Sequence, residues 1–243
     1  MIYASKNIDL HLCDISSIQN QVGKNNYFKP SLYINTEMVM NLDVLPKFAS
    51  KTIDLICALA GKFKKCIVLD LDNIIWGGVI GDDGLENIQI GDLGIGKAFS
   101  EFQYWLKKLK NRGIILSVCS KNNEATAKMP FEKHPDMVLH LDDLAVFVAN
   151  WDNKVANIRK IQSILNVSFD SMVFLDDSPF ERNFVRENIP EINVPELPQD
   201  PADYLEYLYE SNLFETVSFT KEDSERTKYY QMEAKRNINQ QKF

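Results

Sequence analysis

Cysteine and histidine are scarce in this chain, and neither is arranged as a metal site. Of the 243 residues only four are cysteine and three are histidine. No two cysteines form a CxxC pair, and the histidines are scattered. A histidine metal site is therefore not expected, and the cysteines are predicted to be free thiols rather than disulfide partners.

Long runs of one kind of residue are also missing. No apolar stretch is long enough to span a bilayer and no signal peptide is recognised, so we expect a cytoplasmic protein without a membrane partner. The net charge of −7 and the lack of a long basic run disfavour a nucleic-acid partner. The 45% hydrophobic and 25% charged residues are typical of a soluble globular protein.

What the sequence does contain is an alternation of short apolar strands and amphipathic helices. Strands are predicted at 66–71, 114–120, 137–140, 171–177 and 192–194. Helices are predicted at 42–63, 101–113, 153–167, 179–190, 201–214 and 222–237. This alternation predicts an α/β fold whose parallel sheet is covered by helices on both faces.

The domain organisation follows from the same pattern. Residues 1–43 are predicted to be an N-terminal extension or the tail of a preceding domain, with a short strand at 8–15 and loops elsewhere. Residues 44–243 are predicted to form the main domain, which ends in the two C-terminal helices.

Polar residues gather where three predicted strands end. These clusters are Asp70 with Asp72, the run from Cys119 through Ser120 to Lys121, and Asp176 with Asp177. Ligands of parallel sheets bind beyond the carboxyl ends of the strands, so one pocket is expected to collect all three clusters.

The acidic clusters have the composition of a magnesium site. A hard cation such as Mg²⁺ prefers carboxylate and carbonyl oxygens together with water. We therefore predict a Mg²⁺ site formed by Asp70, Asp72, Asp176 and Asp177, to which Asp72 contributes its backbone carbonyl. The alternative is that each acid caps a helix or lies in a loop.

The same residues suggest phosphoryl chemistry. Asp70 is predicted to attack phosphorus as a nucleophile, and Asp72 to move protons as general acid and base. Lys154 is predicted to neutralise a phosphoryl oxygen and to keep Asp70 ionised. Ser120 or Cys119 is expected to donate a hydrogen bond to another phosphoryl oxygen.

Four motifs resemble a known family. The chain reads DLDNIIWGGVIGDDG from residue 70, CSKNN from 119, NWDNKVANI from 150 and FLDDSPFER from 174. Their order resembles the four motifs of the haloacid dehalogenase (HAD) superfamily, and within it the FkbH-like proteins, over roughly residues 42–230. Glu181 takes the place of an outer acid. The departure is Ile74, which stands where the superfamily has threonine.

This resemblance implies a function and a fold. The fold is a HAD-like Rossmannoid sheet with a minimal cap. The reaction is dephosphorylation of a phosphoglyceryl acyl donor resembling 1,3-bisphosphoglycerate, followed by loading of the acyl unit on the thiol of an acyl carrier protein. Two alternatives stay open: a general HAD phosphatase on small phosphoesters, and a non-catalytic interaction module, which Ile74 suggests.

Several residues in the motifs have two open interpretations. Cys119 is either an acyl acceptor, with a pKa lowered beside Lys121, or a small packed residue of the second motif. Trp76 and Gly77 either contact substrate or, as we favour, pack a flap. Lys121 and Asn122 are further candidates for phosphate binding.

The spacing of the motifs bears on access to the pocket. The intervals after Asp72 and after Cys119 are too short for a sizeable cap domain, so only a hairpin flap at 76–92 is predicted. An open pocket suits a large partner such as a carrier protein. Trp151 is expected to pack near Lys154 and hold it in place.

Overall fold

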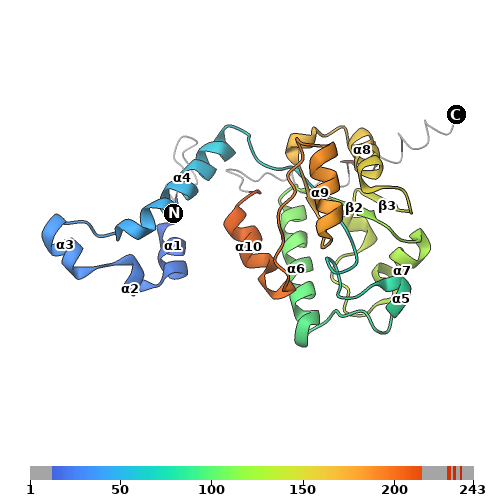
Figure 1. Cartoon of the computed structure of the whole chain (residues 1–243), viewed down its shortest axis with the longest axis horizontal. Helices are drawn as coiled ribbons and strands as arrows, with labels where there is room; N and C mark the ends of the chain where they lie inside the picture. The colour runs from blue at the N-terminus through green and yellow to red at the C-terminus, as the bar shows by residue number, and fades with distance from the viewer. Residues whose placement is uncertain (1–12, 215–228, 231, 234–235, 237–243) are drawn as a thin grey trace. The chain divides into compact units, whose positions relative to one another are not determined.

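The computed structural model describes residues 13–214, 229–230, 232–233 and 236 (Figure 1). The chain divides into two compact units, which separate between Phe63 and Lys64. The boundary predicted at 43/44 lies before helix α4 (Leu45–Leu59), whereas the compact units separate after it.

The first unit consists of helices, and loops had been predicted for those before residue 42. The helices are α1 (Ile15–Val22), α2 (Lys24–Tyr27), α3 (Pro30–Thr36), the 3₁₀ turn η2 (Leu42–Val44) and α4, and the last two lie within the helix predicted at 42–63. The loop prediction was wrong because caps, rather than a long apolar period, define these helices. The Asp14 side chain accepts the Ser17 backbone N–H at the start of α1, and Pro30 begins α3.

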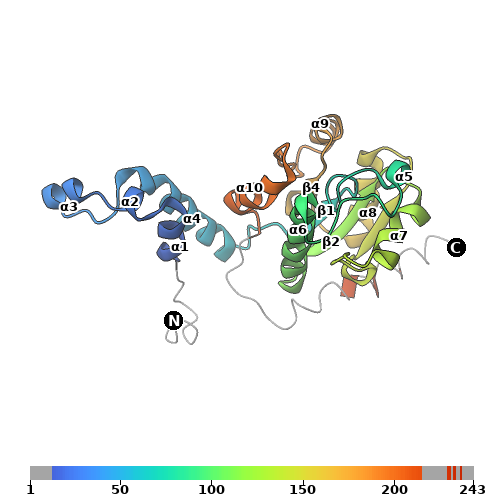
Figure 2. The ribbon, with the colours of Figure 1, turned by 90° about the horizontal axis from the view of Figure 1, so that it is seen from below.

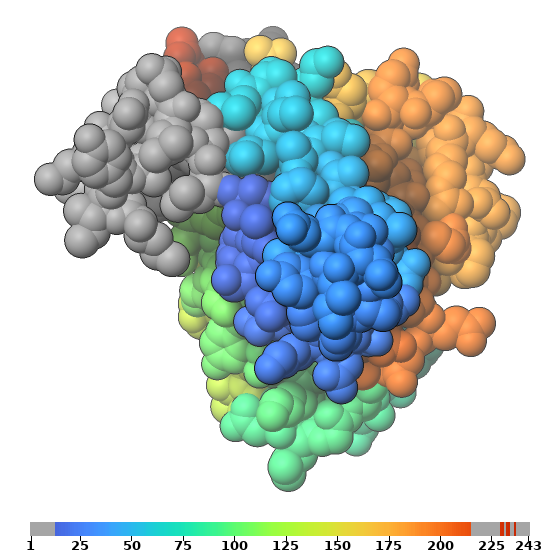
Figure 3. Space-filling model, turned by 90° about the vertical axis from the view of Figure 1, so that its left-hand side faces the viewer, coloured from blue at the N-terminus to red at the C-terminus, as the bar shows by residue number. Residues whose placement is uncertain are grey.

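The surface of this unit appears in blue and cyan in the space-filling view of Figure 3. Its buried residues include Ile18 and Val44. The strand predicted at 8–15 lies mostly outside the described residues, and its last residue, Ile15, already belongs to α1.

The second unit is built on a parallel sheet. Its strands are β1 (Cys66–Leu69), β2 (Ile115–Ser120), β3 (Val146–Ala149) and β4 (Met172–Leu175). They lie in the order β3-β2-β1-β4, and every pair is parallel. The predicted α/β fold class is confirmed.

Helices cover both faces of this sheet, as the views in Figures 1 and 2 show. Alternate residues of a strand point to opposite faces, so each strand contributes to two separate cores. One core, with α6 (Gly94–Asn111), contains Ile67, Leu69, Leu116, Val118, Phe102 and Leu106. The other, with α8 (Lys154–Leu165) and α9 (Pro179–Asn188), contains Cys66, Val68, Ile115, Ile158, Ile161 and Val185.

One predicted strand was misplaced. Residues 137–140 are not a strand, and the sheet instead takes β3 at residues 146–149. The side chains of α6 hold the backbone at 138–139: the Gln103 side-chain oxygen accepts the N–H groups of Val138 and Leu139, both at 3.0 Å. Lys107 donates to the Val138 carbonyl at 2.9 Å. These groups are therefore not available to a strand ladder.

The other predicted helices of this unit are found with shorter bounds, except α6, which begins earlier than predicted, and two helices and two 3₁₀ turns were missed. Helices α6, α8, α9 and α10 (Tyr204–Ser211, preceded by η5, Pro201–Asp203) lie where helices were predicted. Helices α5 (Ile80–Asp83) and α7 (Glu124–Lys133) were not predicted, nor were the 3₁₀ turns η3 (Leu141–Asp143) and η4 (Phe169–Ser171).

Two predictions near the end of the chain are only partly matched. The strand predicted at 192–194 is reduced to one bridge between Val173 and Asn193. The helix predicted at 222–237 lies mostly outside the described residues. Among the described residues, no helix combines the length and the apolar content needed to cross a membrane.

The segment between β1 and α6 forms the predicted flap. Gly77 and Gln89 exchange backbone hydrogen bonds of 3.0 and 2.8 Å, which close a hairpin that contains α5. A Cβ at Gly77 would lie 2.8 Å from both Gln89 Oε1 and Phe99 Cε2, so the hairpin base has room only for glycine. Within the described part of this unit, no larger cap is inserted between the strands.

We predict that Gln103→Leu destabilises the second unit. Gln103 is fully buried, and its amide group binds the Ile75 carbonyl and two backbone N–H groups. Losing these partners leaves buried backbone groups unpaired, which is expected to lower the free energy of unfolding by about 3 kcal/mol. Urea unfolding followed by tryptophan fluorescence measures this value. The control Glu101→Ala, at an exposed position of the same helix, is expected to change it by less than about 0.5 kcal/mol. An equally small effect of Gln103→Leu would contradict the assignment.

Candidate active site

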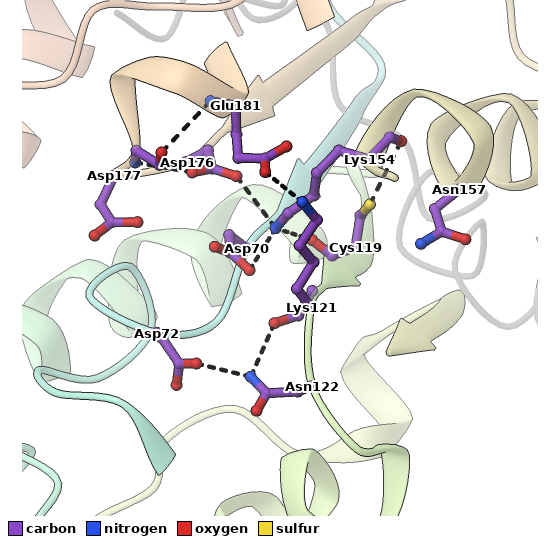
Figure 4. Close-up of polar contacts among 12 residues, drawn as sticks. Asp70, Asp72, Cys119, Lys121, Asn122, Lys154, Asn157, Asp176, Asp177 and Glu181 are labelled. Atoms are coloured by element: carbon purple, nitrogen blue, oxygen red, sulfur yellow. Dashed lines mark hydrogen bonds and ion pairs between the residues drawn. The ribbon is translucent and has the colours of Figure 1, made fainter. Parts of the chain in front are cut away.

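The candidate site lies where the carboxyl ends of the strands meet, and Lys154 is at its centre. Lys154 is the first residue of α8 and is only 1% exposed. Its Nζ lies 2.7 Å from Asp70 Oδ1 and 3.2 Å from Asp176 Oδ2, and it donates a hydrogen bond of 2.9 Å to the Cys119 carbonyl. The ammonium group therefore contacts residues at the ends of β1, β2 and β4 (Figure 4).

The environment of Lys154 favours its charged form. Burial alone lowers the pKa of the Lys154 ammonium, but the charges of Asp70 and Asp176 outweigh this effect and the pKa lies above its ordinary value. Its contacts with Asp70 and Asp176 are ion pairs, and the Cys119 carbonyl accepts its hydrogen bond. Lys154 is thus permanently charged, and it holds Asp70 and Asp176 close to the Cys119 carbonyl at the end of the sheet.

Three acids converge beside Lys154. One carboxylate oxygen from each of Asp70, Asp176 and Asp177 lies within 4.8 Å of the others. Burial, together with the charge of Asp70, raises the pKa of Asp176 to about 6. Burial also raises the pKa of Asp177, although a hydrogen bond from Asn73 opposes the shift. Burial is thus the main cause of both shifts, and the charge of Asp70 adds to it.

The side chain of Asp72 is held apart from those three acids. Its Oδ1 accepts the Trp76 indole N–H and the Ile80 backbone N–H, both at 3.0 Å, and its Oδ2 accepts the Asn122 amide at 2.7 Å. Figure 4 shows Asp72 and Asn122 on one side of Asp70, and Asp176 and Asp177 on the other. The contribution of the Asp72 backbone carbonyl to a metal site stays a prediction.

The second motif lies where β2 ends. Ser120 is buried, and its hydroxyl accepts a 3.2 Å hydrogen bond from Asn122. Asn122 therefore links Ser120 to Asp72. In the flap, Trp76 is fully buried with its ring against Phe131, which supports the packing interpretation of this residue.

Of the two interpretations of Cys119, an acyl acceptor with a pKa lowered beside Lys121 does not match its surroundings. The residue is fully buried, with its sulfur 3.9 Å from the Lys154 carbonyl oxygen. Burial raises the pKa of the thiol to about 12, although the charge of Lys154 opposes the shift. Lys121 is paired with Glu181 instead. The geometry favours the packing interpretation.

The structure reveals two residues that sequence reasoning did not assign to the site. Asn73 has a left-handed backbone (φ 56°), accepts the Gly78 N–H, and donates to Asp177 Oδ2 at 3.0 Å. Arg182 is buried and donates to the backbone carbonyls of Asp176 and Asp177 at 2.9 and 2.7 Å. Two sequence features could have identified them. Asparagine tolerates a left-handed backbone conformation, and the arginine stands at the end of the fourth motif.

Two other residues of the motifs, Lys121 and Trp151, differ in their contacts. Lys121, from the end of β2, forms an ion pair of 2.5 Å with Glu181 in the first turn of α9. Trp151 is 76% exposed, so the prediction that it packs against Lys154 is wrong. The Asn150 and Asn157 side chains bind each other instead, at 2.7 and 3.2 Å, and hold the loop before α8.

We predict that Cys119 is inert toward alkylation in the folded protein. A thiol with a pKa of about 12 is ionised at pH 8 in only about one molecule in ten thousand. The folded chain would be treated with iodoacetamide, and its peptides analysed by mass spectrometry. The partly exposed Cys13 and Cys57 serve as internal controls and are expected to be labelled first. Labelling of Cys119 at the rate of Cys57 would contradict the packing interpretation.

Comparisons with known proteins were made for the whole chain. Residues 1–57 match the model of the FkbH N-terminal domain family. The chain is also similar to the crystal structure of the N-terminal part of a Bacteroides fragilis protein, which contains a phosphatase domain and is complexed with Mg. Sequence identity is 67% and the TM-score is 0.79, and the match covers 85% of this chain and 55% of that one. This chain thus spans little more than half of that structure.

Two further results complete the comparison. A structure from Legionella pneumophila, assigned to the HAD superfamily (subfamily III A) hydrolases, shares 14% identity with a TM-score of 0.36, over 79% of this chain and 97% of that one. That likeness is too low to carry an argument. Among curated proteins there is no match. The family match is to the FkbH N-terminal domain and the Bacteroides fragilis structure contains a phosphatase domain, and together they confirm the resemblance to the FkbH-like proteins that the four motifs predicted.

Proposed function

We propose that this protein is a Mg²⁺-dependent enzyme that handles phosphoryl groups in the manner of the FkbH-like proteins. The observation that carries the proposal is the convergence of Asp70, Asp176 and Asp177 around the ammonium group of Lys154. Perturbed carboxylates grouped at the carboxyl ends of parallel strands are the features expected of a catalytic site.

The three acids fit a magnesium ion. Three carboxylates facing a single ammonium group leave an excess of negative charge. Burial, with a smaller contribution from the charge of Asp70, raises the pKa values of Asp176 and Asp177. Mg²⁺ takes oxygen ligands and is commonly held by a few carboxylates plus waters. Bound there, it would neutralise charge that develops on a transferring phosphoryl group. The Bacteroides fragilis structure is itself complexed with Mg, which supports the choice of ion.

The acids at the end of β1 supply the remaining groups for the reaction. Asp70 is the proposed nucleophile: a carboxylate oxygen bonds to phosphorus while the bond from phosphorus to the leaving oxygen breaks. Asp72, on the flap side of Asp70, is the proposed acid that gives a proton to the leaving oxygen and later takes one from water. Hydrogen bonds from Trp76, Ile80 and Asn122 orient its carboxylate.

The finer proposal concerns what happens to the rest of the substrate. A phosphoglyceryl acyl phosphate carries one phosphate as an ester and one on the acyl carbon. Hydrolysis at Asp70 removes the ester phosphate, and attack by a carrier-protein thiolate on the acyl carbon expels the second phosphate and forms a thioester. The short flap supports this proposal, because it leaves the site accessible to a large partner. The buried Cys119 does not suit the thiol step, so the thiol belongs to the carrier.

Two other functions are separated from this one by simple assays. A general phosphatase is favoured by the phosphatase domain of the Bacteroides fragilis structure, and it would hydrolyse a panel of sugar phosphates without any carrier protein.

A non-catalytic module was suggested by Ile74. That residue is fully buried, and Asn73 links the same turn to Asp177, so a threonine hydroxyl is not needed to hold the turn. Calorimetry that detects no Mg²⁺ binding would favour the non-catalytic module.

We predict that Asp70→Asn abolishes phosphate release. The amide is not a nucleophile, so enzyme-dependent release from a phosphoglyceryl acyl phosphate is expected to fall at least about a thousandfold. Released phosphate and the mass of an added acyl carrier protein are measured together. The wild-type chain is expected to give a glyceryl-sized adduct on the carrier. Glu101→Ala serves as a control with wild-type turnover, and full turnover by Asp70→Asn would rule out the aspartyl mechanism.

We predict that Mg²⁺ binding weakens as the pH falls through 6. The pKa of Asp176 is about 6 in the metal-free protein, so this carboxyl is mostly protonated below that value, and a bound cation has to displace the proton. The same shift has a consequence for stability. Because the folded pKa lies above the unfolded value, this group's contribution to stability is lost as the pH rises through 6. Isothermal titration with MgCl₂ between pH 5 and 8 measures the affinity, and an affinity that does not depend on pH would contradict the prediction.

A further inference from the structure

We propose that Asn73 is a positioning residue, which holds Asp177 in place for the metal ion and ties this acid to the flap. The inference rests on the proposed function, because it takes Asp177 as a ligand of the proposed Mg²⁺ site. It is carried by the two hydrogen bonds of the Asn73 amide group, one to the acid and one to the flap.

The backbone of Asn73 is held in an unusual conformation. Its φ of 56° lies in the left-handed region, which asparagine and glycine adopt more readily than other residues. The Tyr204 hydroxyl donates a hydrogen bond of 3.2 Å to the Asn73 carbonyl, and Tyr204 is buried. The next two residues, Ile74 and Ile75, donate their N–H groups to the Leu71 carbonyl at 3.2 and 2.8 Å. The turn therefore fixes the place from which the Asn73 side chain extends.

The chemistry of its partners fixes the orientation of the Asn73 amide group. The Gly78 backbone N–H can only donate, so the amide oxygen has to face it, at 2.9 Å. The amide NH₂ is then left to face Asp177 Oδ2, at 3.0 Å, and an ionised carboxylate can only accept. A flipped amide would lose both hydrogen bonds. One side chain thus serves the acid and the flap at the same time.

Asp177 depends on this hydrogen bond more than the other two acids would. The ion pairs of Lys154 hold Asp70 and Asp176, which are both buried. Asp177 is not part of those ion pairs, and it is less buried than either acid. Among the described residues, the side chain that donates a hydrogen bond to Asp177 is that of Asn73. Without this donor the carboxylate is free to turn away, and the entropy lost on fixing it would weaken cation binding.

The other hydrogen bond of Asn73 reaches the start of the flap. Gly78 donates its N–H to Asn73, and Ile80 donates its N–H to Asp72 at 3.0 Å. The flap is thus tied to two neighbouring residues of the first motif, and Asn73 is the one that also reaches Asp177. A cation that orders Asp177 therefore also favours the hydrogen bond to Gly78. Because coupling between two sites is reciprocal, the flap contact in turn favours cation binding.

The test compares the wild-type full chain with Asn73→Gly. Glycine adopts the left-handed conformation and lacks the amide group, so the fold is expected to remain. Asn166→Gly is the matched control, because Asn166 is also left-handed (φ 51°) but follows the last residue of α8, at the opposite end of that helix from Lys154. Isothermal titration calorimetry measures the affinity for Mg²⁺. Hydrogen exchange with mass spectrometry follows the flap peptides with and without Mg²⁺.

The expected results follow from the two hydrogen bonds. Asn73→Gly is expected to weaken Mg²⁺ binding about tenfold, since a partner that orients a metal ligand is lost. Exchange of the amides at 78–80 is expected to become about fivefold faster, which corresponds to the loss of one hydrogen bond. In the wild type Mg²⁺ is expected to slow this exchange, whereas in Asn73→Gly it is expected to have little effect on it. Asn166→Gly is expected to match the wild type in both measurements.

Two outcomes would overturn the inference and leave the proposed function intact. One is an Asn73→Gly variant that binds Mg²⁺ as tightly as the wild type, or no more weakly than Asn166→Gly. The other is faster exchange throughout the second unit rather than in the flap, which would give Asn73 a purely structural role. A wild-type chain that binds no Mg²⁺ would overturn both. If the wild type binds Mg²⁺ but releases no phosphate from the phosphoglyceryl acyl phosphate, the proposed function fails, and the affinity and exchange of Asn73→Gly still decide the role of Asn73.

Discussion

One buried ammonium group contacts the carboxyl ends of three of the four strands. Lys154 begins α8, directly after the β3 loop, and reaches Asp70 after β1, the Cys119 carbonyl on β2 and Asp176 after β4. A buried charge is tolerated only where opposite charges and hydrogen bonds compensate it, and here two carboxylates pair with the ammonium group and the Cys119 carbonyl accepts its hydrogen bond. If this lysine were removed, two buried carboxylates would face each other without a counter-charge. The acid cluster, and any cation held by it, depends on this contact.

Much of this arrangement could be predicted from the sequence because the relevant signals are local. A short apolar run that ends in acids predicts a strand with carboxylates at its end, and parallel strands bring such ends together. The contacts that define the site more finely were not predictable. They depend on which of several polar groups comes within bonding distance: Asn73 with Asp177, Arg182 with two backbone carbonyls, and Gln103 with residues 138–139. That last contact is why the third strand was misplaced.

Errors about single residues share one physical cause. One of the two interpretations of Cys119 gave its thiol a pKa lowered beside Lys121, and Trp151 was expected to pack near Lys154. In the structure Lys154 is already neutralised by carboxylates, so burial determines the pKa of the thiol. The asparagine pair at 150 and 157 fixes the loop, and the indole is left exposed. Proximity in the sequence indicates which charged and polar groups can come near a residue. The ion pairs and hydrogen bonds that those groups form then decide the pKa and the exposure of that residue.

The flap and the acids are linked through Asp72. Its carboxylate accepts hydrogen bonds from Trp76 and Ile80 in the flap on one oxygen and from Asn122 after β2 on the other. A rearrangement of the flap would therefore change the donors around the residue proposed to move protons. Because Trp76 is fully buried and Gly77 has no room for a side chain, the base of the flap is rigid. The Trp76 donor belongs to this rigid base, whereas the Ile80 donor lies in α5, in the hairpin beyond residue 78. A movement of that hairpin would reach the Asp72 carboxylate through Ile80, while the hydrogen bonds from Trp76 and Asn122 would still hold it.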